Sequence, residues 1–324
     1  MNNWDLVVQK YPEANFLQSP EYAKMNELLG CKVFVEDFES RAHVLMIIRN
    51  AKRGRYMEIP CGPLVDFGDA KLVKEVFDKI TEIAKREKCV FVRMRPQLLM
   101  NEKNMKILEK LGLKKSPMHL AAEHTVMVDL TKSEEDLLGG MRRQTRYEVR
   151  RADKVGIEVN SSNDEEIFKE FHKVQAETAK RQNFVPPSLK TLLAERDAFS
   201  DNIMIYKASF ESEPVAYGLI IKSGLEADYY EAASTLLNRK MPGAYALLWR
   251  VIRDLKAEGY ARFNLWGIAP AGQPNHHYAG VTTFKTGFSD EVVEFVPAHD
   301  LIISKVRYMA DFAFETMRKK KRRL

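Results

Sequence analysis

The sequence predicts a mixed α/β protein built from two copies of one domain, and three observations support this. Its 324 residues suit two domains, since ~100 to 200 residues per domain is usual. Hydrophobic residues make up 45% and charged residues 30%, which is typical of folded chains. Runs with strand character alternate with segments of helical periodicity, and this order begins again near His124.

The first half predicts strands and helices of one mixed layer. Residues 31–49 read as two strands around a polar turn. Apolar residues recur at helical spacing over 72–83, and a strand follows at 89–96. Residues 103–111 predict a second helix, which Gly112 ends.

The second half repeats this pattern. Ser133 and the acidic residues after it predict a helix start, and we expect that helix to run on through Arg150. The remaining expected strands are 125–130, 156–160, 202–210, 214–223, 226–234 and 261–267. The remaining expected helices are 165–179, 189–199, 245–257 and an amphipathic last helix, 301–317.

The net charge of +6 comes from one end of the chain. Lys and Arg total 51 against 45 Asp and Glu, and six of the basic residues are the run Arg318–Arg323. Without that run the formal charge is zero, so any nucleic-acid site elsewhere must be a local patch.

Several classes of protein are disfavoured. The three cysteines are far apart and lack metal-ligand spacing, so we expect no disulfide framework and no metal site. No apolar run approaches the ~20 residues of a membrane span, and the N-terminus does not resemble a signal peptide. The absence of GxSxG, P-loop and HExxH motifs argues against hydrolases, NTPases and zinc enzymes. We expect a cytoplasmic protein.

Two segments could bind phosphate. Arg142, Arg146 and Arg150 recur every four residues, which predicts one basic helix face, although a solvated face explains the spacing equally well. Residues 238–244 form a basic loop with Arg239 and a Pro-Gly pair before an apolar helix, where backbone N–H groups can hold an anion. That loop loosely resembles the pyrophosphate loop of acetyltransferase-like N-acyltransferases.

Lys285 is the candidate for chemistry. It lies between Phe284 and Phe288, and a cation desolvated by aromatic neighbours acts more strongly on a developing oxyanion or phosphate than it would in water. The alternative is an ordinary surface lysine. Tyr229 and Glu231 on one expected strand offer hydrogen-bonding groups.

Motifs across nearly the whole chain, in order, resemble the FemABX family of aminoacyltransferases. They are FLQSPEYAKM (16–25), IPCGPLVDF (59–67), MVDLTKSEEDLLGGMRRQTRYEVRRADKVGIEV (127–159), ETAKRQNF (177–184), NLWGIAP (264–270) and FKTGFSDE (284–291). This resemblance implies tandem acetyltransferase-like (GNAT-like) domains at 1–122 and 123–299, with residues 300–324 returning to the first. No heptad insertion for a coiled-coil arm is visible.

The implied reaction moves an amino acid of the Gly, Ala or Ser class from aminoacyl-tRNA to a stem-peptide amine of a peptidoglycan precursor, without a cofactor. Lys285, at the family's FK lysine, would act at the tRNA terminus and the oxyanion, and Lys24 would hold acceptor phosphates. The substrate-binding candidates are Lys24, Tyr22, Gly62, Pro63, Tyr229, Glu231, Gly267 and Phe284. The candidates for tRNA phosphates are Arg142, Arg146, Arg150 and Arg239.

The sequence departs from the family in two places. Residues 229–234 read YYEAAS where members often have a Tyr-x-x-Gly-Ala-Ser strand. The arginine that some soluble-precursor members carry is replaced near Pro186 and Pro187, which favours a lipid-linked over a nucleotide-linked acceptor. The basic run 318–323 would then supplement tRNA attraction or contact anionic lipid at the inner face of the membrane.

Two other functions remain open. An acyl-CoA-dependent N-acyltransferase would bind CoA at the loop 238–244. A non-catalytic RNA-binding or membrane-surface module would use the arginine face and the basic tail, and Lys285→Ala would leave it functional.

Overall fold

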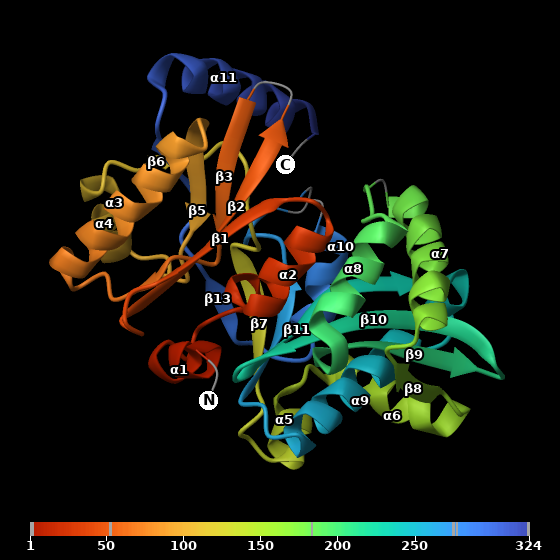
Figure 1. Cartoon of the computed structure of the whole chain (residues 1–324). Helices are drawn as coiled ribbons and strands as arrows, with labels where there is room; N and C mark the ends of the chain where they lie inside the picture. The colour runs from red at the N-terminus through yellow and green to blue at the C-terminus, as the bar shows by residue number, and fades with distance from the viewer. Residues whose placement is uncertain (1–2, 52–53, 183, 274–275, 277, 323–324) are drawn as a thin grey trace. The chain divides into compact units, whose positions relative to one another are not determined.

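The computed structural model describes residues 3–322 except 52, 53, 183, 274, 275 and 277, and it divides into two compact units (Figure 1). Unit 1 comprises Met1–His124, Ala269–His277 and Val293–Leu324. Unit 2 comprises Thr125–Ile268 and Tyr278–Val292. No helix within the described residues is both long and apolar enough to cross a membrane.

Unit 1 is a sheet with helices. Its strands are β1 (Lys32–Asp37), β2 (Ala42–Ala51), β3 (Gly54–Pro60), β4 (Leu64–Val65), β5 (Cys89–Arg95), β6 (Lys114–Lys115) and β14 (His299–Ile302). Its helices are α1 (Asn3–Lys10), the 3₁₀ turn η1 (Phe16–Gln18), α2 (Pro20–Leu28), α3 (Ala70–Arg86), α4 (Glu102–Lys110) and α11 (Lys305–Arg322). The strands follow the order β1-β2-β3-β5-β14-β6, and β4 pairs with β2.

The core of unit 1 forms where α3 packs on this sheet. Asp69 caps α3 by accepting a hydrogen bond from the Leu72 N–H at 3.0 Å. Apolar residues three and four apart then line one face of the helix: Leu72, Val73, Val76, Phe77, Ile80, Ile83 and Ala84. They join the buried side chains of β2, β3 and β5 in one cluster.

Unit 2 is likewise built on one β-sheet with helices packed against it. The strands of its sheet are β7 (His124–Asp129), β8 (Glu158–Ser162), β9 (Ile203–Phe210), β10 (Glu213–Ser223), β11 (Glu226–Ser234) and β12 (Arg262–Gly267), with the edge strand β13 (Val292–Glu294) beginning at the last residue of the unit. Its helices are α5 (Glu134–Gly140), α6 (Arg143–Val155), α7 (Glu165–Gln182), α8 (Leu189–Phe199), α9 (Gly243–Ala257) and α10 (Ala279–Lys285), with 3₁₀ turns η2 (Ser200–Asn202) and η3 (Leu236–Arg239). The strand order is β13-β7-β12-β11-β10-β9-β8.

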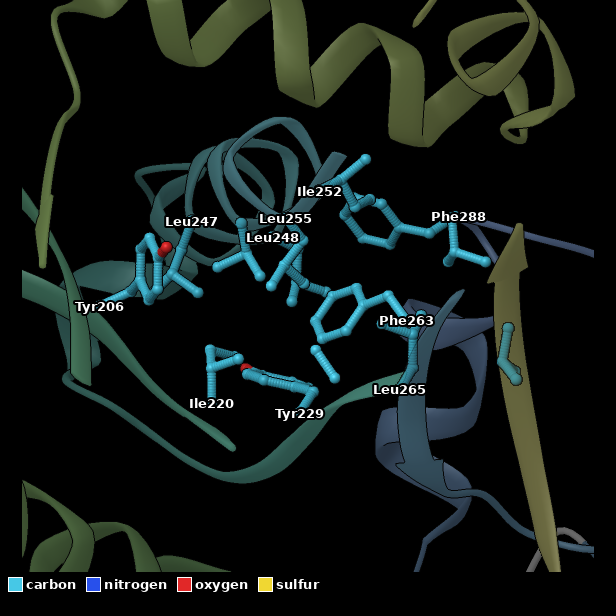
Figure 2. Close-up of a cluster of buried hydrophobic side chains, with 14 of the residues drawn as sticks. Tyr206, Ile220, Tyr229, Leu247, Leu248, Ile252, Leu255, Phe263, Leu265 and Phe288 are labelled. Atoms are coloured by element: carbon cyan, nitrogen blue, oxygen red, sulfur yellow. The ribbon is translucent and has the colours of Figure 1, made fainter. Parts of the chain in front are cut away.

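The largest core of unit 2 lies between its sheet and α9. Figure 2 shows Leu247, Leu248, Ile252 and Leu255 of this helix above the rings of Tyr229 and Phe263. Figure 1 shows α6 and α9 on one face of the sheet and α7 and α8 on the other. The two faces of a strand in this sheet therefore meet different helices.

The two sheets share one topology. In unit 1, β1, β2 and β3 are antiparallel neighbours, β5 lies parallel to β3, and β14 is antiparallel to β5. In unit 2, β9, β10 and β11 are antiparallel neighbours, β12 lies parallel to β11, and β7 is antiparallel to β12. The crossover helix is α3 in one sheet and α9 in the other. This correspondence confirms the duplication that the sequence predicts.

The expected continuous helix from Glu134 through Arg150 is wrong. The helix breaks into α5 and α6, and Arg142 stands between them as the extended N-cap of α6 with φ −59° and ψ 143°. The adjacent Gly139 and Gly140 weaken helix continuation. The backbone N–H of Arg142 donates instead to the carbonyl of Gly287 at 2.9 Å. Arg142 is therefore not on the helix that carries Arg146 and Arg150.

Candidate functional site

Lys285 is buried at the end of α10 in unit 2. The residue is 9% exposed, and its Nζ donates to the carbonyl of Gly267 at 2.9 Å. Nζ also lies 5.9 Å from the centroid of the Tyr229 ring. Burial lowers the pKa of this amine to about 7. Lys285 is thus a buried amine that can be either charged or neutral near neutral pH.

The aromatic neighbour of the Lys285 amine differs from the expected one. Phe284 and Phe288 contact each other with ring centroids 5.4 Å apart, and Tyr245 packs on both. These three rings hold α10 against α9. The ring nearest the amine belongs to Tyr229, which is distant in sequence and comes from β11.

Gly267 must be small because an aromatic ring packs against it. A Cβ at this position would lie 2.8 Å from the Tyr278 ring. Gly267 ends β12, directly after Trp266, whose φ is +62°. The Gly267 carbonyl at this turn accepts the hydrogen bond from Lys285, so the NLWG and FKTG segments meet there.

Arg142 also contacts α10 and the residues that follow it. Its guanidinium donates to the carbonyl of Thr283, and its backbone N–H binds the carbonyl of Gly287. A Cβ on Gly287 would meet the Thr145 Oγ1 at 2.2 Å, so the chain approaches α6 very closely there. The structure therefore brings the arginine-rich motif and the FKTGF motif together around α10.

The other predicted phosphate contacts are dispersed. Arg146 donates to the carbonyls of Gly139 and Met141, so its guanidinium already binds backbone. Arg150 is exposed on α6, and Arg239 is exposed on η3. At the start of α9, the Asn238 side chain accepts a hydrogen bond from the Ala244 N–H at 3.1 Å. One of the N–H groups of that helix end is therefore already used.

Tyr229 and Glu231 lie on opposite faces of the sheet, although residues two apart on a strand normally share a face. Ile220 pairs with Tyr229 and Leu219 pairs with Glu231, so Tyr230 is an extra residue in a β-bulge. Tyr229 joins the core under α9, and burial raises the pKa of its hydroxyl. The bulge turns Glu231 toward α7 instead.

Glu231 belongs to a buried polar group that sequence reasoning missed. The Gln175 Nε2 of α7 donates to its carboxylate at 2.5 Å. Burial raises the pKa of Glu231 to about 7. Burial, and then the charge of Glu231, also raise the pKa of Glu195 on α8, a residue that is 3% exposed. The signal in the sequence was a glutamine on the apolar face of the helix 165–182.

The unit 1 candidates gather around a second missed residue, Gln18. Its buried side chain donates to the Pro60 carbonyl at 2.7 Å and accepts from the Leu45 N–H at 2.8 Å. A Cβ on Gly62 would lie 2.5 Å from this amide, so only glycine fits there. Pro63 follows through a cis peptide bond. The FLQSPEYAKM and IPCGPLVDF segments thus meet at Gln18.

Helix α2 begins directly after this point and carries the other two candidates. Ser19 caps it by accepting from the Tyr22 N–H at 3.2 Å. The Tyr22 ring packs edge-on against Phe16 with centroids 6.0 Å apart, while Lys24 is exposed. Lys24 is therefore an exposed cation on the first turns of a capped helix.

Comparison with known proteins gives a consistent result. The model of the FemAB family matches residues 2–212 and 202–316. Aminoacyltransferase FemA of Staphylococcus epidermidis is 22% identical over 76% of this chain and 80% of the relative. The crystal structure of FemX matches with a TM-score of 0.85 at 16% identity, covering 96% of this chain and 98% of that one.

A tandem GNAT protein from the clavulanic acid biosynthesis pathway also matches in fold, with a TM-score of 0.56 at 11% identity. The match covers 93% of this chain and 94% of that one. These likenesses confirm the predicted fold class of tandem acetyltransferase-like domains. Consistent with the expected lack of a coiled-coil arm, the longest helices among the described residues, α7 and α11, have 18 residues each.

Proposed function

The chain belongs to the FemAB family, and from this premise we propose that it is an aminoacyltransferase that acts on a peptidoglycan precursor. The donor is an aminoacyl-tRNA, and the acceptor is the side-chain amine of the stem peptide. Relatives named Aminoacyltransferase FemA support the reaction class. Within the structure, the observation that carries the proposal is the buried Lys285 amine at the Gly267 carbonyl.

The reaction is the aminolysis of an ester. The neutral acceptor amine attacks the ester carbonyl carbon, and a C–N bond forms as the C–O bond to the tRNA ribose breaks. The departing ribose oxygen receives the proton that the nitrogen loses. Because the ester is already activated, the enzyme needs only to align the reactants and stabilise the oxyanion, so no covalent intermediate is required.

Lys285 is the catalytic residue in this scheme. In its charged form, the amine stabilises the oxyanion and the nearby tRNA terminus, and burial strengthens its field. Its low pKa means that charge is retained best in slightly acidic solution or beside a substrate phosphate. Gly267 and Phe284 contribute by fixing the α10 segment and by lining the donor site.

The remaining candidates bind substrate. Lys24 binds the phosphates of the acceptor, and Tyr22, Gly62 and Pro63 form the surface that binds the rest of the acceptor. In unit 2, Tyr229 positions the Lys285 amine. Glu231, with its raised pKa, accepts a hydrogen bond from a substrate amine.

Arginines contact tRNA phosphates in this proposal. Arg150 and Arg239 are exposed and available for direct contact. Arg142 and Arg146 already donate to backbone carbonyls, so they act by adding positive potential near α10 and α6.

The acceptor is lipid-linked, since the arginine of some soluble-precursor members is replaced near Pro186 and Pro187. The amino acid is of the Gly, Ala or Ser class. The protein works in the cytoplasm at the inner face of the membrane, with residues 318–323 in peripheral contact with anionic lipid. Of these six residues, Arg323 lies outside the described part of the chain.

A matrix of substrates tests the proposal. The protein is incubated with each of several charged tRNAs, combined in turn with a lipid-linked and a nucleotide-linked stem peptide, and the products are identified by mass. We expect product from one class of charged tRNA and faster formation on the lipid-linked acceptor. Transfer from acetyl-CoA, without transfer from any charged tRNA, would instead favour the acyl-CoA-dependent enzyme.

A further inference from the structure

Helix α11 is held to unit 1 by one face. Tyr308 is 2% exposed, its ring packs 5.6 Å from that of Phe91, and its hydroxyl donates to Asp300 at 3.0 Å. Arg93 of β5 binds Glu315 of the helix at 2.7 Å and Asp300 of β14 at 2.8 Å. These buried contacts fix which side of α11 faces the sheet.

The other face of α11 is apolar and exposed. Val306 is 84% exposed, Met309 73% and Met317 63%. Ala310 and Ala313 are also exposed, and they lie between these residues at intervals of three and four. Such spacing aligns side chains on one side of a helix, here the side away from Tyr308. We call these five residues the outer stripe; at 1.5 Å per residue it is roughly 17 Å long.

Positive charge lies at both ends of the outer stripe. Lys305 and Arg307 flank its first residue and are exposed. Arg318, also exposed, begins the basic run that continues through Arg323, which is outside the described residues. Of the two acidic residues on the helix, Glu315 is bound by Arg93 on the inner side. An apolar strip between cationic ends is complementary to a surface that is negatively charged outside and apolar beneath.

We propose that the outer stripe docks on the surface of an anionic lipid bilayer, with its apolar side chains in the interface and the flanking cations at lipid phosphates. A second copy of the chain fits this face poorly, because pairing two outer stripes would bring basic ends together. The phosphate backbone of a nucleic acid would contact the cations but would leave the apolar side chains of the outer stripe without an apolar partner. The inference rests on the membrane contact proposed for residues 318–323 and adds the surface that makes it; it does not depend on the transfer reaction.

Vesicle sedimentation with the full chain tests this surface. The vesicles contain either phosphatidylcholine alone or a mixture with phosphatidylglycerol, in ~0.15 M salt. We expect wild-type protein to bind the anionic vesicles and to bind the neutral ones at least ~10-fold less tightly.

The test variant is Val306→Ser, Met309→Ser, Met317→Ser, which keeps every charge. We expect it to bind anionic vesicles ~10-fold or more weakly, because the buried apolar area is lost. The control is Val35→Ser, Leu99→Ser, Val185→Ser, which alters apolar residues that are 50%, 56% and 89% exposed elsewhere. The control should bind like wild type, and all three proteins should melt at similar temperatures since the altered residues are exposed.

Three outcomes would overturn the inference: no binding of wild type to anionic vesicles, equal binding by the Val306, Met309, Met317 variant, or a wild-type dimer that this variant makes monomeric. Transfer assays keep the two proposals separate. Vesicle binding without aminoacyl transfer would leave this inference standing and remove the proposed function. Aminoacyl transfer without vesicle binding would leave the transfer reaction standing and remove this inference.

Discussion

At the scale of single residues, the account depends most on Lys285, whose amine is buried with one carbonyl partner and one aromatic ring nearby. We expect Lys285→Ala to lower turnover at least ~100-fold, as loss of an oxyanion-stabilising group does. Single-turnover rates with charged tRNA measure this effect. Lys173→Ala, which alters an exposed lysine of α7, is the control and should keep full activity. An unchanged rate in Lys285→Ala would remove this residue from the mechanism.

The lowered pKa of Lys285 predicts a pH dependence. Since the charged amine is the active form, kcat/KM should lose the contribution of this charge as pH rises through about 7 in the free enzyme. Lys285→Arg keeps its charge throughout this range, so the falling limb should disappear in that variant, whatever its absolute rate. If wild type and Lys285→Arg have the same falling limb near pH 7, another group causes it.

The raised pKa of Glu231 predicts how the free energy of unfolding depends on pH. Its folded-state pKa is raised to about 7, so between about 4.5 and 7 the folded state binds more protons than the unfolded state. Stability from this group is therefore present at low pH and lost as pH rises through this window. Glu231→Gln should flatten the decline in urea midpoint between pH 5 and 7. A decline as steep as that of wild type would show that Glu231 ionises without penalty.

At the scale of elements, the docking of α9 depends on Gly243. A Cβ there would lie 2.4 Å from the Val215 side chain of β10, with no room in the core. We expect Gly243→Ala to destabilise unit 2 by ~1 to 3 kcal/mol, as overpacking does. Denaturant unfolding measures this effect. Gly139→Ala is the control: no atom lies within 4 Å of its Cβ position, so it should be neutral or slightly stabilising. Equal stability of both variants would contradict the close packing.

Many of the helices and strands could be predicted from the sequence because the residues that determine them lie within the element or next to it. The apolar face of α3, the Ser133 cap and the glycine after α4 each lie within a few residues of the feature they determine. The break before α6 has one local signal, Gly139 and Gly140, but its exact form has none. The Arg142 N–H leaves the helix for a carbonyl at Gly287, and no local pattern encodes a partner so far along the chain.

The candidate site shows the same limit. Lys285 stands out in the sequence through its aromatic neighbours, but the Gly267 carbonyl and the Tyr229 ring come from other strands. The bulge at Tyr230 also reverses the face of Glu231, which a simple alternation places beside Tyr229. Gln175 and Gln18 are recognisable only as polar residues in apolar surroundings until their partners are known.

At the scale of the whole molecule, the end of the chain completes the sheet that its beginning starts. β14 pairs with β5, and Arg93 joins β5, β14 and α11 through Asp300 and Glu315. We expect Arg93→Ala to destabilise unit 1 by ~3 to 5 kcal/mol, because a buried carboxylate loses its partner. Calorimetry measures this loss. Lys74→Ala, which breaks the exposed pair with Asp78, should cost less than ~1 kcal/mol. Comparable losses in both variants would contradict the buried network.

The central claim concerns the whole molecule as well, namely that it transfers an amino acid from tRNA to a stem peptide. The most direct test is the mass of a stem peptide after incubation with the protein and tRNA charged with an isotopically labelled amino acid. The account predicts a mass increase of one labelled residue that disappears when the tRNA is deacylated beforehand. A peptide of unchanged mass with every charged tRNA, from protein shown to be folded, would contradict it.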